Sequence, residues 1–280
     1  MYEIPSPIKK AINRYDPVEI VGLTLYPIRV KEYTELNIAT PAITFMQQTL
    51  PVDLMRVPLL TAYYQMALSA VANPTEGCDL FYRAILFLAL ALRIGEDEDI
   101  QNRVMQIVPI ADKTKPSDLK CLRFIDRGGE EKDITPVQFQ KIRTILAAQN
   151  GIALIPEDAN PELVEAENEI LNSQGPKLNV DLATEISFVA ALSHEEERDI
   201  DDWPVLKLKK REQTFTHLLS YLICGTAEAQ GTKWKEGNPY PHPIFEKIKT
   251  TSAALKKLED VASGEAAKAV QNPGQKTFSQ

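Results

Sequence analysis

The sequence has little of the material from which many active sites are built. Its 280 residues include three cysteines, three histidines and twelve glycines. Cys78, Cys121 and Cys224 lie far apart and form no CxxC pair, so neither a disulfide framework nor a cysteine metal site is expected. We interpret all three as small buried thiols in a protein of a reducing compartment.

Recognisable catalytic and nucleotide-binding motifs are also missing. The sequence contains no GxGxxG, no P-loop and no GxSxG. Residues His194 to Arg198 (HEEER) come nearest to HExxH, but arginine stands where the second histidine is needed. His217 and Cys224 share a helix face and could both be metal ligands, but two ligands do not make a metal site. His242, which could in principle join them, is remote in sequence. We therefore predict no catalytic residues, no cofactor and no metal site, and no enzyme activity.

Long apolar runs are absent as well. The most apolar window, Ala84 to Leu92, has nine residues, about half of the roughly 20 that cross a bilayer. Residues Met1 to Lys10 hold an acid and two prolines where a signal peptide needs a basic start and an apolar run. We expect a protein made in the cytoplasm that does not bind membranes.

The charge is negative and unevenly distributed. A net charge of -8 argues against general nucleic-acid binding, which needs a dense basic surface. Residues 157–202 hold 14 acids and two bases, whereas 203–257 hold ten bases and four acids. These segments could be solvated faces, or could pair within the fold, within a homo-oligomer or with partner proteins.

What the sequence does have is a pattern typical of a folded, mainly α protein, with 44% hydrophobic residues. We predict a multi-helix body with a small N-terminal β element over 18–30 and a β-hairpin near 119–134. Residues 5–17 read as an irregular leader, and Pro41, Pro51 and Pro58 are expected to separate short segments. Helices are predicted over 31–40, 55–71, 79–94, 136–150, 160–174, 180–192, 206–229 and 244–261.

The helix predicted over 79–94 has almost no polar face and should lie at the centre of the body, with Asp79 and Gly95 as its caps. We divide the chain into a helical body over 1–175, a C-terminal helical segment with a Trp/Pro-rich loop over 176–250, and a weak helix with an extended tail over 251–280. The tail from 263 on lacks the apolar surface to fold alone.

Aromatic residues are the best lead to a binding function. Trp203, Trp234 and Tyr240 are of the types that anchor protein interfaces, because each covers a large area with little loss of rotamer freedom. The tail itself could be a docking peptide, with Phe278 as its single large apolar group. Core packing of the tryptophans and fraying of the tail are the alternatives.

Four stretches carry a resemblance to a known group of proteins: 22–36 (GLTLYPIRVKEYTEL), 135–152 (TPVQFQKIRTILAAQNGI), 160–170 (NPELVEAENEI) and 211–245 (REQTFTHLLSYLICGTAEAQGTKWKEGNPYPHPIF). The chain resembles, from about residue 18 to 245, the tail assembly chaperones and tail-morphogenesis proteins of tailed bacteriophages of Gram-positive bacteria. The resemblance lies in composition and carries over no binding residue.

The resemblance implies a helical, non-enzymatic protein of the host cytoplasm that binds other tail proteins, such as tape measure, tube or baseplate subunits. Tail assembly chaperones are thought to hold the apolar tape measure protein while tube subunits polymerise around it. One alternative is a permanent component of the tail, baseplate or neck, located in the virion. Another is a cytoplasmic enzyme that uses the paired carboxylates Asp97 with Asp99 or Asp201 with Asp202.

Overall fold

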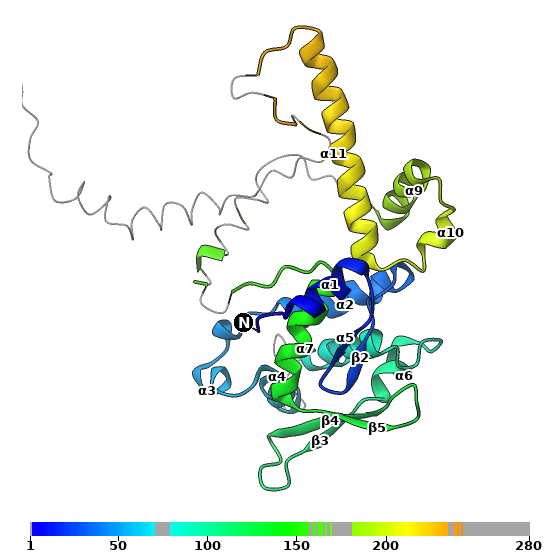
Figure 1. The fold of residues 1–280 in the computed structure, drawn as a ribbon. Helices are drawn as coiled ribbons and strands as arrows, with labels where there is room; N and C mark the ends of the chain where they lie inside the picture. Colours follow the sequence, from blue (N-terminus) through cyan, green and yellow to red (C-terminus); the bar gives the residue numbers. More distant parts are fainter. Residues whose placement is uncertain are drawn as a thin grey trace, which may run out of the picture. The chain divides into compact units, whose positions relative to one another are not determined.

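The computed structural model describes residues 2–70, 79–156, 159–160, 162–164, 166, 169, 181–234, 238–240 and 242. Within these residues the fold is mainly α with two small antiparallel sheets, which confirms the predicted fold class (Figure 1). The α-helices are α1 Ser6–Arg14, α2 Tyr33–Thr44, α3 Val52–Met55, α4 Leu59–Ala70, α5 Leu80–Leu92, α6 Ile100–Met105, α7 Pro136–Gln149, α9 Leu182–Ser193, α10 Glu197–Ile200 and α11 Val205–Ala229. The 3-10 helices are η1 Val30–Glu32 and η2 Gln47–Thr49, and the strands are β1 Val18–Ile20, β2 Leu23–Leu25, β3 Val108–Ala111, β4 Leu119–Ile125 and β5 Glu131–Ile134.

Contacts divide the chain into two compact units. The first comprises Met1–Leu163 and Leu178–Thr216, and the second comprises Val164–Lys177 and His217–Gln280. Helix α11 contributes its first half to the first unit and its second half to the second. No helix in the described residues is long and apolar enough to span a membrane.

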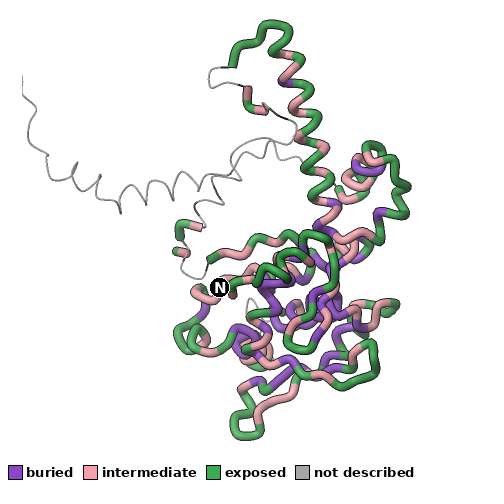
Figure 2. The backbone as a smooth tube through the Cα atoms, in the orientation of Figure 1, coloured by how far each residue is buried: buried purple, intermediate pink, exposed green. Residues whose placement is uncertain are grey.

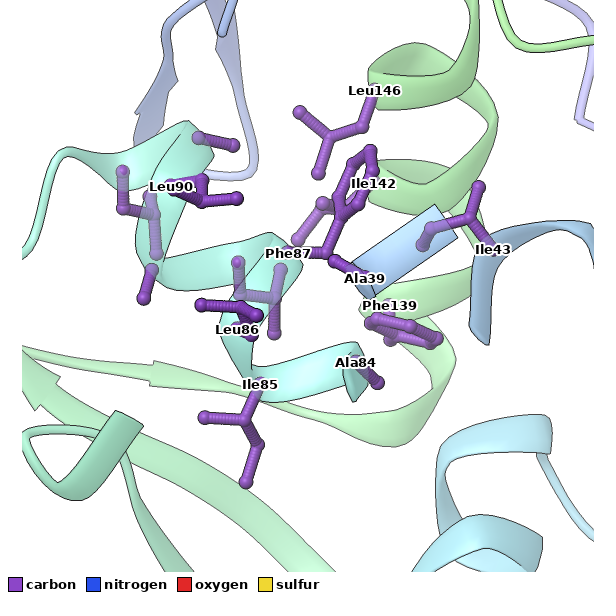
Figure 3. Close-up of a cluster of buried hydrophobic side chains, with 14 of the residues drawn as sticks. Ala39, Ile43, Ala84, Ile85, Leu86, Phe87, Leu90, Phe139, Ile142 and Leu146 are labelled. Atoms are coloured by element: carbon purple, nitrogen blue, oxygen red, sulfur yellow. The ribbon is translucent and has the colours of Figure 1, made fainter. Parts of the chain in front are cut away.

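Helix α5 lies at the centre of the first unit, as its uniformly apolar sequence predicts. It contacts α2, α4, α6 and β2. In Figure 3, side chains of α2, α5 and α7 converge on one cluster, in which Phe87 and Phe139 are both fully buried. A helix that is apolar all round has no face to offer water, so it is stable only when other elements enclose it.

Both predicted β elements are present. Strands β1 and β2 form a hairpin with Val18 opposite Leu25, and the two turn residues, Val21 and Gly22, have the positive φ angles that a tight two-residue hairpin needs. Strands β4 and β5 form the second hairpin, and the carboxylate of Asp126 accepts hydrogen bonds from backbone N–H groups in its turn. The sequence did not reveal β3, which pairs with β4 to make a three-stranded sheet.

Helix α7 begins and ends as predicted. Thr135 Oγ1 accepts a hydrogen bond from the N–H of Gln138, and Gln138 Oε1 accepts one from the N–H of Thr135, which is a complete capping box. At the other end, buried Asn150 accepts a hydrogen bond from the N–H of Ile28 at 3.0 Å. The helix therefore anchors the chain segment that follows the N-terminal hairpin.

A smaller apolar cluster joins α9, α10 and the first half of α11 to the segment that ends at Val30. Three backbone hydrogen bonds of 2.9 Å support it, from Val30 N to Trp203 O, from Lys31 N to Asp201 O and from Val205 N to Ile28 O. This tie between distant parts of the sequence belongs entirely to the first unit.

Two predicted element types are corrected by the structure. Residues 6–14, expected to be irregular, form α1, whose Ile12 is buried and whose Ile8 packs against the core. Pro41, expected to end a helix, lies inside α2. Because Ala39, Ala42 and Ile43 on both sides of it are buried, core packing outweighs the local cost of the proline.

Two predicted boundaries also shift. The helix expected over 55–71 divides into α3 and α4, and α4 starts directly after Pro58. Helix α5 ends at Leu92, and its C-cap is Arg93 in the left-handed conformation rather than the predicted Gly95. The guanidinium of Arg93 stacks on the ring of Tyr26, 4.5 Å from its centroid, and this contact stabilises the strained position. Most of the helix expected over 160–174, and all of that expected over 244–261, lie outside the described residues.

Candidate partner-binding surface

The apolar stripe of α11 continues beyond the core that covers its beginning. In the first half of the helix, Leu208 is buried and Phe215 is half-buried against the second apolar cluster. Spacings of three, four and seven residues keep one helix face in register, so Leu219 and Leu222 continue the face of Leu208 and Phe215. The same face is thus core in the first unit and surface in the second.

The second half of α11 exposes several large apolar side chains. Leu222 is 52% exposed and Ile223 is 68% exposed, with Leu218 and Leu219 near 40%. Most of this half of the helix is drawn as exposed in Figure 2. We call Leu218, Leu219, Leu222 and Ile223 the α11 apolar face. Complete burial of a fully exposed side chain of this size contributes roughly 1.5–3 kcal/mol, so a partner that covered these half-exposed side chains would gain part of that amount from each.

Two of the predicted site residues lie in the same unit as this face. Trp234 is 36% exposed, shortly after the end of α11. Tyr240 is half-buried, and its ring centroid lies 6.0 Å from that of His217 on α11. Asn238 holds this loop on the helix by donating a hydrogen bond to the carboxylate of Glu228 at 2.9 Å. Tyr240 thus contacts α11, and Trp234 follows the helix in the same unit.

The other two predicted site residues differ in their setting. Trp203 belongs to the first unit, where it is half-buried against the second apolar cluster and Lys207 Nζ lies 3.4 Å from the centroid of its ring. One face of the Trp203 ring is therefore already covered by Lys207 of the same chain. Phe278 lies outside the described residues.

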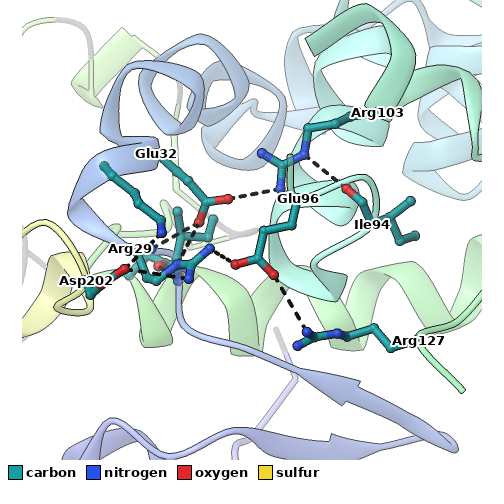
Figure 4. Close-up of polar contacts among 10 residues, drawn as sticks. Arg29, Glu32, Ile94, Glu96, Arg103, Arg127 and Asp202 are labelled. Carbon is teal, nitrogen blue, oxygen red and sulfur yellow. Dashed lines mark hydrogen bonds and ion pairs between the residues drawn. The ribbon is translucent and has the colours of Figure 1, made fainter. Parts of the chain in front are cut away.

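Ion pairs form a polar network in the first unit (Figure 4). Arg103 and Glu32 are buried partners, 2.9 Å apart, with side chains 5% and 8% exposed. Arg29 pairs with Glu32, Glu96 and Asp202, and so connects the segment before α2 to the loop before α11. A buried pair with good geometry fixes the position of its elements more than it adds to stability.

Glu96 shows how the network acts on one carboxyl group. Partial burial by itself raises its pKa, but the hydrogen bond from Arg29 and the nearby charges of Arg93 and Arg127 outweigh burial, so the pKa is lowered. The folded protein therefore holds Glu96 ionised more firmly than the unfolded chain does. This is the signature of a structural ion pair.

A cavity of about 220 Å³ opens beside this network. Its described lining includes Tyr26, Arg127 and Lys132, with no histidine or cysteine among the lining residues. Arg127 pairs with Glu96, and Lys132 pairs with Glu130, so both cations already have carboxylate partners.

One member of each carboxylate pair considered for catalysis makes a structural contact through its side chain. Asp99 caps α6 by accepting a hydrogen bond from Asn102 N, and Asp202 pairs with Lys31 at 2.9 Å. Asp97 is exposed, and the backbone oxygen of Asp201 accepts the hydrogen bond from Lys31. Within the described residues, no group of three or more His, Cys, Asp or Glu side chains is placed to hold a metal ion.

The remaining sequence candidates are placed as follows. Cys121 and Cys224 are buried free thiols, as predicted, and Cys78 lies outside the described residues. Burial and the nearby carboxylate of Asp133 raise the pKa of the Cys121 thiol, which keeps it protonated and unreactive. His194 ends α9 in the left-handed conformation, which agrees with its interpretation as part of a polar helix terminus.

Comparison of the chain with protein-family models, with curated proteins and with solved structures found no match.

Proposed function

We propose that this chain is a non-enzymatic bacteriophage tail-morphogenesis protein of the tail assembly chaperone type. Its role is to bind an apolar helical segment of another tail protein, and the tape measure protein is the partner we favour. The α11 apolar face supports this proposal most directly, because a core-like stripe exposed on a helix is typical of a helix-binding surface.

The aromatic residues fit the same role. Trp234 is exposed and Tyr240 is held on α11, so a partner helix lying along the α11 apolar face could bury a tryptophan at its end. Interfaces of this kind obtain most of their binding free energy from a few aromatic and large apolar residues. The identity of the partner rests on the resemblance of the sequence to tail-morphogenesis proteins, and the mode of binding rests on the helix.

The test is co-purification of the tagged full-length chain with the tape measure, tube and baseplate proteins of the phage that encodes it. We expect the tape measure protein to be retained by the unaltered chain. The double variant Leu222→Ser/Ile223→Ser should lose it, because the partner would then bury polar hydroxyls in place of apolar groups. The matched control is Val137→Ser, which alters a 66% exposed apolar residue elsewhere. Equal retention by the chain and the double variant would contradict the proposal.

Mass spectrometry of finished phage particles separates the two structural roles. A chaperone is absent from purified particles, whereas a permanent component of the tail, baseplate or neck remains in them. Finding the chain at stoichiometric level in particles would replace the chaperone role with the component role. In either role the host cytoplasm is where the chain is made and first binds its partner.

A further inference from the structure

A small cavity on the first half of α11 gathers three positively charged side chains. It has a volume of about 270 Å³ and lies wholly in the first unit. Its lining consists of Tyr15, Lys207, Lys210, Arg211 and Thr214. Among the described residues, no carboxylate oxygen lies within 4.0 Å of a nitrogen atom of Lys207, Lys210 or Arg211. This sets the cavity apart from the ion-pair network, whose cations all have acid partners.

Helix geometry brings the cations together. Lys207, Lys210, Arg211 and Thr214 are spaced by three, four and seven residues and so share one face of α11. Like charges four residues apart, such as Lys207 and Arg211, repel one another and destabilise the helix. Burial lowers the pKa of Lys207, Arg211 lowers it further, and Glu195 opposes both. An anion placed between these cations would relieve the repulsion.

Aromatic rings hold the two lysines in place. The ammonium of Lys207 lies 3.4 Å from the ring centroid of Trp203, and that of Lys210 lies 5.5 Å from the ring centroid of Tyr15. Such contacts limit the motion of long side chains, so less conformational entropy is lost when an anion binds. Arg211 offers the planar set of donors that matches a carboxylate with two hydrogen bonds.

We propose that this cavity is a binding site for an acidic segment of a partner protein, whose carboxylates enter between Lys207, Lys210 and Arg211. The site lies on a different unit from the α11 apolar face and does not depend on it. Its size suits one or two acidic side chains.

An acidic peptide fits the observations better than a nucleic acid does. The chain has a net charge of -8, which repels a long polyanion. Glu195 adds negative potential at Lys207, and the three cations of the cavity lie within about two turns of α11. Nucleic-acid binding needs a longer basic track, because each phosphate contact contributes little by itself.

The experiment measures binding of a short fluorescein-labelled Ala/Glu peptide to the full-length chain by fluorescence anisotropy. A peptide with Gln in place of every Glu, and single-stranded DNA of the same length, are the comparison probes. We expect the Glu peptide to bind, the Gln peptide to fail, and the affinity to fall as NaCl rises from about 50 to about 300 mM.

The double variant Lys210→Gln/Arg211→Gln should weaken binding of the Glu peptide by about tenfold or more, because two charge-assisted contacts are lost. The control Lys113→Gln removes an exposed lysine from the loop between β3 and β4 and should leave the affinity unchanged. Urea unfolding checks that both variants fold, and we expect them to, because Lys210, Arg211 and Lys113 are exposed. Three results would overturn the proposal: no binding of the Glu peptide, equal loss in the control, or tighter binding of DNA that the double variant abolishes.

Discussion

Single residues in this chain show how charge is made compatible with burial. Arg103 donates one hydrogen bond to the backbone oxygen of Ile94 at 3.0 Å and another to Glu32 at 2.9 Å, so little of its guanidinium lacks a partner. Buried Tyr63 donates its hydroxyl proton to the backbone oxygen of Ala42, and burial raises its pKa although the charge of Arg143 acts in the opposite direction. These residues hold elements together through their hydrogen bonds.

Glu96 provides a test of the ion-pair network at this scale. Its pKa is lower in the folded protein, so its stabilising effect is fully present above the unfolded pKa and is lost as the pH falls through the folded pKa. At pH 7, Glu96→Gln should reduce the free energy of unfolding by about 1–3 kcal/mol, because Arg29 loses a charged hydrogen-bond partner. The difference from the unaltered protein should shrink as the pH falls below about 4.

Urea unfolding of the two proteins at a series of pH values measures this difference. The control is Glu98→Gln, which alters an exposed glutamate in the same loop and should change stability by less than about 0.5 kcal/mol at any pH. A constant difference between Glu96→Gln and the unaltered protein at all pH values would show that Glu96 acts through packing and not through its charge.

At the scale of elements, local signals and core packing determine different features. Helix α7 follows its local signals, since Thr135, Pro136 and the apolar spacing predict where it begins and how it runs. Helix α2 does not, because Pro41 lies within it and the buried residues on both sides outweigh the proline. In helix α11, local spacing sets one continuous apolar stripe, whereas packing decides that the stripe is buried in the first half and exposed in the second.

Thr135→Ala tests the local contribution to α7. Loss of the hydroxyl removes the acceptor for Gln138 N, and the free energy of unfolding should fall by about 1 kcal/mol. Thr135→Ser keeps the hydroxyl and should restore most of this loss. Thermal and urea unfolding measure both variants, and a loss of similar size in Thr135→Ser would indicate that the methyl group is the important part of the side chain.

At the scale of the whole molecule, substitutions in the apolar cluster around α5 and in the α11 apolar face should have different effects on the free energy of unfolding. The cluster around α5 is enclosed, so Phe87→Ala should lower the free energy of unfolding by about 3–5 kcal/mol, a large part of the stability of a typical domain. Leu222→Ser/Ile223→Ser changes side chains that are already exposed, and we expect stability to change by less than about 1 kcal/mol.

Urea unfolding of the three proteins decides whether the α11 apolar face is a surface of the free chain. If the double variant were destabilised as much as Phe87→Ala, the face would be part of the protein's own interior, and binding through it would be untenable. If the double variant keeps its stability but no longer co-purifies with the partner, the two substitutions act on binding through the α11 apolar face and not on folding.

The sequence by itself determined the helical class, the central position of α5, both hairpins and the boundaries of α7 and α11. These depend on periodicity, capping and turn chemistry within a few residues of each other. It also predicted Trp234 and Tyr240 as partner-binding residues, and that prediction awaits the binding experiment, whereas their place in the same unit as the α11 apolar face could not be inferred.

Only the tertiary structure decided which half of the α11 stripe is buried, because burial depends on elements distant in sequence that happen to pack there. It also placed Trp203 beside Lys207, joined Arg29 to Glu96 and Asp202, and formed the basic cavity from Tyr15 and α11. A charge pattern predicts that a surface is basic, but whether its cations have acid partners depends on the three-dimensional neighbours of each side chain.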